Sequence, residues 1–360
     1  MKITFVAPYP NLAGGNRVVA DYAEGLRRKG HDVVFAAAAS SRSVRRQVRS
    51  AIRERKLPSR ENNAAIKSHF QNRDIEIIFA EKPGPVLAET VPDADIIIAT
   101  WWETAFWIKD FPAEKGEKFY FMQDYGASNQ PLDRLIESWH FGYKMITISR
   151  WLDSLVQKFA PQPTALVING VDPALFDVGA RQKATPPTVG FLYSSLPTKG
   201  AAFAIDAIGK AASQIPDLAV QILGELPEEF LRQLPSNTTV RHHVRDDALR
   251  DIYGACDAWL FPSLHEGFGL PILEAMACGT PVIAFASSAA PEVMGDNVGV
   301  LTPIGDVDRM ADAIVRFANM PESDWRDHAE AARNTVYPFY TVDRAVEDFE
   351  AALLNFPETR

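Results

Sequence analysis

The sequence is poor in the features that mark secreted, membrane-spanning and nucleic-acid-binding proteins. Its 360 residues include only 2 cysteines, too few for a disulfide framework and typical of a reducing compartment. No apolar run approaches the length that spans a bilayer, and the opening MKITFVAPYP lacks the long apolar core of a secretory signal. The net charge of −9 disfavours a nucleic-acid partner, because a phosphate backbone calls for a basic face. We therefore expect a cytoplasmic protein.

What the chain does have is a regular alternation of short apolar segments and helical patterns. Strands are predicted at 2–7, 31–37, 75–80, 94–100, 117–123, 143–149, the start of 164–176, 188–194, 218–225, 238–244, 258–263 and 281–286. Helices are predicted at 16–30, 150–160, 199–212, 246–257 and 271–278, and only helices after residue 286. This order predicts two doubly wound, Rossmann-like α/β domains facing across a cleft, with ligand at the carboxyl ends of the strands.

One segment, HEGFGLPILEAMACGT at 265–280, combines two carboxylates with a glycine loop and a helix start. Pro271 sits where a helix begins, and Gly267 and Gly269 let the backbone approach a ligand. A helix start offers unpaired N–H groups and partial positive charge, which suit a phosphate. Glu274 is expected in the first helical turn, accepting hydrogen bonds from sugar hydroxyls, with Glu266 at the rim of the loop. The alternative is that Glu274 only complements the helix dipole and Glu266 is solvated.

Residues 265–285 resemble the E-x7-E segment of glycosyltransferase family 4, retaining enzymes of the GT-B fold. The wider resemblance covers 14–33, 169–176, 199–208 and 287–306. It implies transfer of a sugar from a dTDP-, UDP- or GDP-sugar with retention at the anomeric carbon, without a metal or other cofactor. It also implies that Glu274 binds the donor ribose and that Glu266 lies against the donor sugar. Further donor contacts are implied at Gly267, Phe268, Gly269 and Leu270.

The resemblance also implies a division of the chain. Residues 1–180 would form an acceptor-side domain and 189–340 a nucleotide-sugar domain. The polar, proline-rich segment 181–188 reads as the linker between them. The last residues, 341–360, would form a helix that packs back on the N-terminal domain.

Lys199 is expected at the start of a helix, where a cation opposes the helix dipole unless an anion is also present. By resemblance it holds the donor diphosphate and takes part in catalysis. The family usually has an arginine shortly before this lysine, where this chain has Ser194 and Ser195. Either these serines suffice with Lys199, or another cation such as Arg245 contributes. His243 lies near the position where the family holds the base, or is an ordinary loop residue.

A glycine pair, Gly14 and Gly15, is expected to form a loop between the first strand and helix. The spacing of this pair does not fit the dinucleotide-binding motif G-x-G-x-x-G, so the hypothesis of a Rossmann-fold dehydrogenase lacks its main sequence evidence. By resemblance the pair lies over the donor phosphate or the acceptor; otherwise it is only a tight turn. Glu292 either touches the donor or complements the helix that follows 287–290.

Polar and aromatic residues follow two strands of the first half, in TWWETAFWI and KFYFMQDYGA. Asp124 is the predicted group that receives the acceptor proton or holds the acceptor hydroxyl, with Glu103 second. Trp101 and Trp102 would stack on sugar faces, or simply pack in the core. These two motifs, with Gln123 before Asp124, loosely resemble bacterial polysaccharide rhamnosyltransferases.

Five arginines recur at helical spacing in residues 41–60, opposite a valine and isoleucine stripe. This basic helix either lies on an anionic membrane and meets a lipid-linked acceptor, or is a solvated helix packed by its apolar stripe. The predicted function is a retaining, metal-independent hexosyltransferase acting on a glycan or lipid-linked saccharide, at the inner face of the membrane if that helix binds lipid. The alternatives are a small natural product as acceptor, a nucleotide-sugar epimerase of the same fold, and a non-catalytic sugar-nucleotide binding module.

Overall fold

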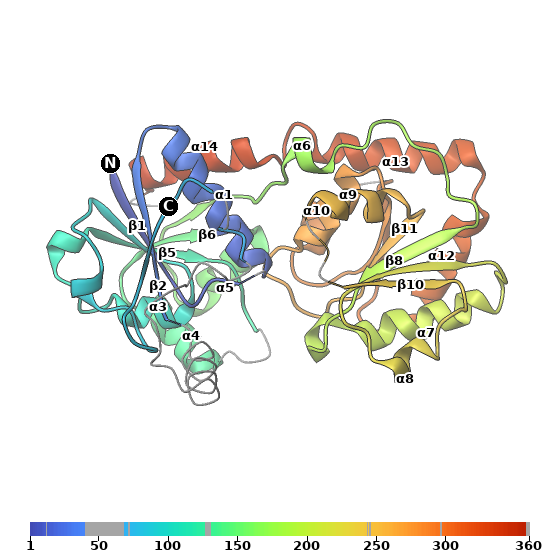
Figure 1. Ribbon diagram of the computed structural model, residues 1–360, viewed down its shortest axis with the longest axis horizontal. Helices are drawn as coiled ribbons and strands as arrows, with labels where there is room; N and C mark the ends of the chain where they lie inside the picture. Colours follow the sequence, from blue (N-terminus) through green and yellow to red (C-terminus); the bar gives the residue numbers. More distant parts are fainter. Residues whose placement is uncertain are drawn as a thin grey trace, which may run out of the picture.

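Two parallel β-sheets, each covered by helices on both faces, make up the two lobes of the computed structural model (Figure 1). The predicted doubly wound α/β architecture is therefore confirmed. The structure describes residues 1–11, 13–39, 68–70, 73–126, 131–242, 244, 246–295 and 297–357. The predicted basic helix 41–60, His243 and Arg245 lie outside the described residues. Within the described residues, no helix is both long and apolar enough to cross a membrane.

The N-terminal lobe is built on a seven-stranded sheet in the order β3-β2-β1-β4-β5-β6-β7. The strands are β1 (Lys2–Ala7), β2 (Asp32–Ala37), β3 (Glu76–Phe79), β4 (Ile96–Ala99), β5 (Glu117–Met122), β6 (Lys144–Thr147) and β7 (Thr164–Leu166). All pairings are parallel, and β1 lies between β2 and β4. The winding direction reverses at this point, so the carboxyl ends of β1 and β4 border the crevice where such sheets bind ligands.

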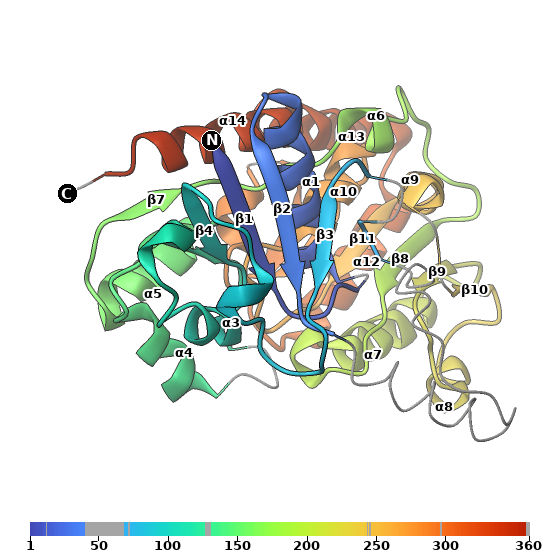
Figure 2. The same cartoon turned by 60° about the vertical axis from the view of Figure 1, so that its left-hand side comes forward.

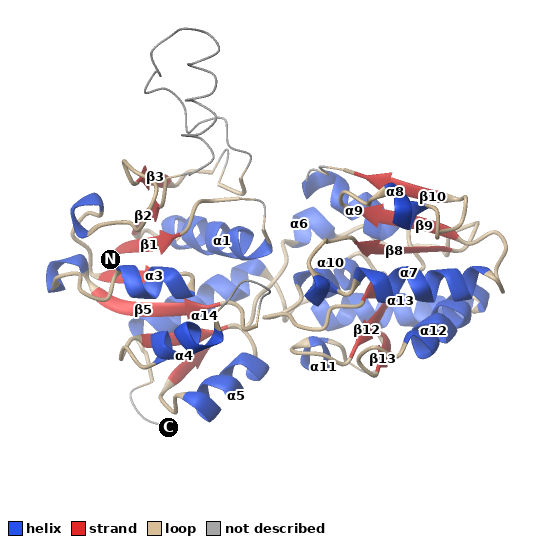
Figure 3. Cartoon of the chain, turned by 90° about the horizontal axis from the view of Figure 1, so that it is seen from below, coloured by secondary structure: helices blue, strands red, loops and turns tan. Residues whose placement is uncertain are grey.

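Helices α1 (Gly14–Arg28) and α14 (Val342–Leu354) cover one face of this sheet, as Figures 1 and 2 show. The other face carries α3 (Trp102–Trp107), α4 (Leu132–Trp139) and α5 (Arg150–Phe159), seen from below in Figure 3. The C-terminal helix contributes to the core of this lobe, because the fully buried Phe349 ring lies 4.9 Å from that of Tyr22 and 5.0 Å from that of Phe121. A Cβ on Gly25 would stand 2.5 Å from Val346, so the close crossing of α1 and α14 requires a glycine there.

The second lobe holds a six-stranded parallel sheet in the order β10-β9-β8-β11-β12-β13. Its strands are β8 (Thr188–Leu192), β9 (Ala219–Leu223), β10 (Thr238–Arg241), β11 (Ala258–Phe261), β12 (Val282–Phe285) and β13 (Gly299–Thr302). The helices after the first lobe are α6 (Pro173–Phe176), α7 (Ala201–Ala212), α8 (Glu228–Leu231), α9 (Asp246–Gly254), α10 (Leu270–Ala277), α11 (Ala290–Val293), α12 (Val307–Asn319) and α13 (Glu322–Val336).

Two sequence predictions about these elements are wrong. A strand, β13, follows residue 286 where only helices were expected. It is a four-residue edge strand with only one buried residue, Thr302, so it lacks the apolar run that marks the central strands. In addition, Gly14 and Gly15 form the first turn of α1 and not a loop before it. Because glycine is a poor helix former, the helix was predicted to begin at Asn16, two residues after its actual start at Gly14.

Candidate functional site

A cavity of about 560 Å³ lies between the lobes, at the carboxyl ends of β1, β4 and β5 and against the β11–α10 loop. The predicted site residues that line it are Gly14, Gly15, Trp101, Glu103, Gln123, Asp124, Lys199, Glu266, Gly267, Phe268, Gly269 and Leu270. Four predicted residues do not line it, namely Trp102, Ser194, Ser195 and Glu274. The topology thus brings most of the predicted residues of both lobes to one cleft.

The β11–α10 loop fits closely against the N-terminal lobe. A Cβ on Gly267 would stand 1.8 Å from the backbone oxygen of Gln123, so only glycine allows this approach. The Ser149 hydroxyl, at the start of α5, donates to the Gly267 carbonyl at 2.9 Å. Gly269 has a φ of 94° and leads directly into α10. The loop therefore reaches the N-terminal lobe through its backbone, and the start of α10 faces the cavity.

Glu266 and Lys199 form an ion pair on the C-terminal side of the cavity. The Lys199 Nζ lies 2.5 Å from Glu266 Oε1, and the Ser263 hydroxyl donates to the same oxygen at 3.1 Å. The Glu266 N–H donates to the Ser288 hydroxyl at 2.9 Å, which anchors the β11–α10 loop to the rest of the C-terminal lobe. Among described residues, Lys199 is the only lysine or arginine that lines the cavity. An anionic ligand would therefore compete with Glu266 for this cation.

Asp124 stands on the N-terminal side of the same cavity. The pKa of Asp124 is raised to about 6, chiefly by burial and also by the negative charge of Glu266. The Tyr125 N–H, which donates to Asp124 Oδ1 at 2.7 Å, and the charge of Lys199 act in the opposite direction. Asp124 is thus a carboxyl group that changes charge near neutral pH, as a general acid or base must.

Glu274 lies in the second turn of α10, and its predicted place in the first turn is wrong. The helix begins at Leu270, one residue before Pro271, so Glu274 is its fifth residue. Glu274 is 5% exposed, and its carboxylate is held from two sides. Tyr253 donates to Oε2 at 2.6 Å, and Arg17 of α1 forms an ion pair with Oε1.

The first turn of α1 faces the start of α10 across the cavity. A Cβ on Gly14 would lie 3.5 Å from the Leu270 side chain, and one on Gly15 would lie 3.4 Å from Gln123 Oε1. The first N–H groups of a helix have no partner within the helix. Two helix starts therefore border one cavity, which favours an anionic ligand there.

The remaining candidates divide between the cavity and its surroundings. Trp101 and Glu103 line the cavity, whereas Trp102 packs edge-to-face on Phe106 with ring centroids 6.1 Å apart. The Ser194 hydroxyl accepts from the Leu196 N–H at 3.3 Å. Within the described part of the chain, no three His, Cys, Asp or Glu side chains are grouped so that they could hold a metal ion.

We did not predict Arg17, Tyr253 or His265 as site residues. His265 lines the cavity beside Glu266, and Arg17 and Tyr253 hold Glu274. Arg17 carries the same signal that identified Lys199, a cation near the start of a helix. Tyr253 gives no such signal, because its contact with Glu274 depends on how α9 packs on α10.

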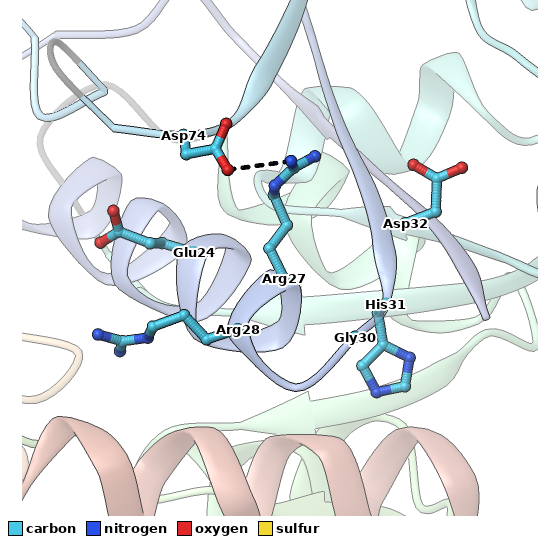
Figure 4. Close-up of a pocket in the computed structure, with 7 residues that line it drawn as sticks. All are labelled: Glu24, Arg27, Arg28, Gly30, His31, Asp32 and Asp74. Atoms are coloured by element: carbon cyan, nitrogen blue, oxygen red, sulfur yellow. Dashed lines mark hydrogen bonds and ion pairs between the residues drawn. The ribbon is translucent and has the colours of Figure 1, made fainter.

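A second, smaller cavity of about 390 Å³ lies at the other end of α1 (Figure 4). Its lining mixes charges of both signs, and Arg27 pairs with Asp74 at 3.1 Å. His31, at its edge, contacts Glu350 of α14 at 2.7 Å. These pairs stabilise the packing around α1, and we assign this cavity no ligand.

Comparison with known proteins finds similarity to one family within the second lobe. Residues 186–320 match the family model described as Glycosyl transferases group 1. The O-antigen chain mannosyltransferase B of Escherichia coli is 40% identical over 89 residues, covering 25% of this chain and 23% of that protein. The N-acetyl-alpha-D-glucosaminyl L-malate synthase of Bacillus anthracis is 31% identical over 153 residues, covering 41% and 39%. The chain thus spans less than half the length of these curated relatives.

Solved structures resemble the whole chain. Anabaena HepE, solved in complex with UDP and glucose, gives a TM-score of 0.76 at 17% identity and covers 99% of this chain and 100% of that one. The sucrose-phosphate synthase of Thermosynechococcus elongatus gives 0.72 at 19% identity and covers 98% of each. At this level of identity the likeness shows the fold alone, and the predicted GT-B fold is confirmed.

Proposed function

We propose that the chain is a retaining glycosyltransferase that moves a sugar from a nucleoside diphosphate to a hydroxyl group of a glycan. One observation carries the proposal. The cavity between the lobes has Glu266, Lys199 and the start of α10 on one wall, and these lie in the segment that matches Glycosyl transferases group 1. The GT-B fold supports the same function only by analogy, because one fold can host several reactions.

In this reaction the bond between the anomeric carbon and the phosphate oxygen breaks, and the acceptor oxygen bonds to that carbon from the same face. The acceptor proton passes to the leaving phosphate oxygen. Lys199 and the N–H groups of the helix starts stabilise the charge on the diphosphate, so that no metal is required. Glu266 orients the sugar and stabilises positive charge at its ring, while Asp124 holds the acceptor hydroxyl.

The donor is a UDP-, GDP- or dTDP-sugar, and the acceptor a glycan of a bacterial polysaccharide or cell surface, or a lipid-linked saccharide. The named relatives include a mannosyltransferase for an O-antigen chain, and one structural neighbour binds UDP. We propose that the protein works in the cytoplasm. Contact with an anionic membrane would depend on residues 41–60.

Thermal unfolding with a panel of UDP, GDP, ADP, dTDP and their sugars, all in chelator, tests the donor site. A ligand that binds only the folded state raises the melting temperature according to its affinity. One nucleotide that raises it in chelator would identify the base and support metal-independent binding. No shift with any nucleotide, with or without magnesium, would contradict the proposal.

Turnover then separates the enzyme from its two alternatives. A glycosyltransferase releases free nucleoside diphosphate with an acceptor and slowly with water. A GT-B epimerase would convert the donor sugar without an acceptor, and a binding module would release nothing. Retention is read from the anomeric configuration of the product by NMR.

A further inference from the structure

An ion pair joins the two lobes beside the cavity. Arg17 belongs to α1 of the N-terminal lobe, and Glu274 belongs to α10 of the other lobe. Their side chains are only 14% and 7% exposed, so the pair is largely removed from water. Arg17 is the fourth residue of α1, where a cation opposes the helix dipole. The Glu274 carboxylate supplies the anion that makes this position favourable.

The same carboxylate is fixed on its other side by Tyr253. The Tyr253 hydroxyl, fully buried in the C-terminal lobe, donates to Oε2 at 2.6 Å, while Arg17 takes Oε1. Each carboxylate oxygen can accept two hydrogen bonds, so neither contact uses the full capacity of its oxygen, and Glu274 itself lies behind the residues that line the cavity. The two contacts therefore fix the orientation of the Glu274 carboxylate before a ligand binds.

The pair lies one helical turn from the place where the lobes meet at the cavity. Gly14 is three residues before Arg17 on α1, and Leu270 is four residues before Glu274 on α10. Both line the cavity, and they are neighbours across it. Residues three or four apart lie on one face of a helix, so Arg17 and Glu274 are next to this contact.

We propose that Arg17 is a positioning residue of the donor site, holding the Glu274 carboxylate from the opposite lobe in the direction that receives the ribose hydroxyls. This inference rests on the proposed function. It makes recognition of the ribose depend on both lobes, because one lobe supplies the carboxylate and the other supplies its orientation.

Isothermal titration calorimetry tests this with pairs of nucleotides. The probe is whichever of UDP, GDP or dTDP binds the wild type, together with its analogue without ribose hydroxyls. We expect Arg17→Met to weaken the hydroxyl-bearing nucleotide about tenfold, the effect of one charge-assisted hydrogen bond. The affinity for the analogue should stay unchanged. Arg17→Lys should recover part of the loss, and Arg28→Met, at an exposed arginine of the same helix, should leave both affinities unchanged.

Every other outcome contradicts the inference. If Arg17→Met weakens both ligands equally, Arg17 acts on the phosphates or on folding and does not orient Glu274 toward the ribose. If it weakens neither, the ion pair has no part in binding. If the wild type binds no nucleotide, the proposed function itself fails, and this result is distinct because it appears before any variant is made.

Discussion

Asp124 lies between two opposite charges, and this setting controls when it is ionised. Its pKa is raised to about 6 from an ordinary value of 3.8, first by burial and then by Glu266, while Lys199 lowers it. Lys199 is also paired with Glu266. A diphosphate that draws Lys199 away would leave two carboxylates facing each other, and Asp124 would then hold its proton more tightly.

This setting gives a prediction about pH. If ionised Asp124 holds the acceptor, kcat/KM should rise as the pH passes about 6, and Asp124→Asn should remove that rise and lower kcat about 100-fold. Between pH 3.8 and about 6 the folded state binds more protons than the unfolded state, so this group's contribution to stability falls as the pH rises. Thermal melts at pH 4 and pH 7.5 should therefore show Asp124→Asn gaining stability relative to wild type only at the higher pH. A wild-type profile that is flat through pH 6 would count against this role.

Lys199 gives a second prediction at this scale. If it stabilises the leaving diphosphate, Lys199→Met should lower kcat/KM about 100-fold, the usual effect of losing one group that stabilises developing charge. Lys210→Met is a control, because Lys210 lies on α7, the helix that follows Lys199, but is exposed and pairs with Asp308. The activity of both variants is measured as the initial rate of nucleoside diphosphate release. Equal rates for the two variants would show that Lys199 is not the phosphate cation.

The sequence was most informative for residues whose chemistry depends on local structure. Lys199 and Glu266 could be identified because each lies beside a glycine and a helix start. Arg17 and Tyr253 depend on contacts over 257 and 21 residues, which no local pattern encodes. Glu274 was identified but placed in the wrong turn, because helix ends are uncertain by one or two residues.

At the level of elements, the central strands were predictable because they are buried on both sides. All four residues of β4, β11 and β12 are buried, so these strands appear as continuous apolar runs. The edge strand β13 is partly exposed and was missed. Segment 181–188 was predicted only as a linker from its composition, but Arg181 donates to the backbone carbonyls of Cys256 and Cys278. Such anchoring depends on tertiary contacts that composition does not reveal.

The β11–α10 loop gives a prediction at the same scale. Gly267→Ala would place a methyl group 1.8 Å from the Gln123 oxygen, so the loop and the N-terminal lobe must move apart. We expect activity to fall at least 10-fold, since small displacements at a reacting site are costly. Gly209→Ala, on an exposed position of α7 with its nearest neighbour 3.9 Å away, should leave activity unchanged and slightly raise the melting temperature. Wild-type activity in Gly267→Ala would show that this contact is not needed for catalysis.

At the level of the whole molecule, three polar contacts hold the lobes together around the cavity. These are the Arg17–Glu274 pair, the Ser149–Gly267 hydrogen bond and a contact of Glu292 with the start of α5. The chain also returns from the second lobe through α13 to place α14 on the first (Figure 2). Residues of both lobes therefore complete the lining of the cavity.

Glu292 offers the clearest test of how closure affects binding. Its carboxylate accepts from the N–H groups of Arg150 at 2.9 Å and Trp151 at 3.4 Å, reaching from α11 to the first turn of α5 in the other lobe. A negative charge at a helix start is favourable, and Glu292→Ala removes it from between the lobes. Helix α5 keeps its own cap, because the Ser149 hydroxyl accepts from the Leu152 N–H. Neither lobe should therefore unfold.

We expect Glu292→Ala to favour a more open molecule. Small-angle X-ray scattering should give a larger radius of gyration without ligand, and saturating nucleotide should restore the wild-type value. Affinity for the nucleotide should fall several-fold, because the binding-competent closed form is then less populated. Glu330→Ala, at an exposed position on α13, is the matched control. If the radius and the affinity both match the wild type, closure depends on the contacts of Arg17 and Ser149, and the charge of Glu292 serves only α5.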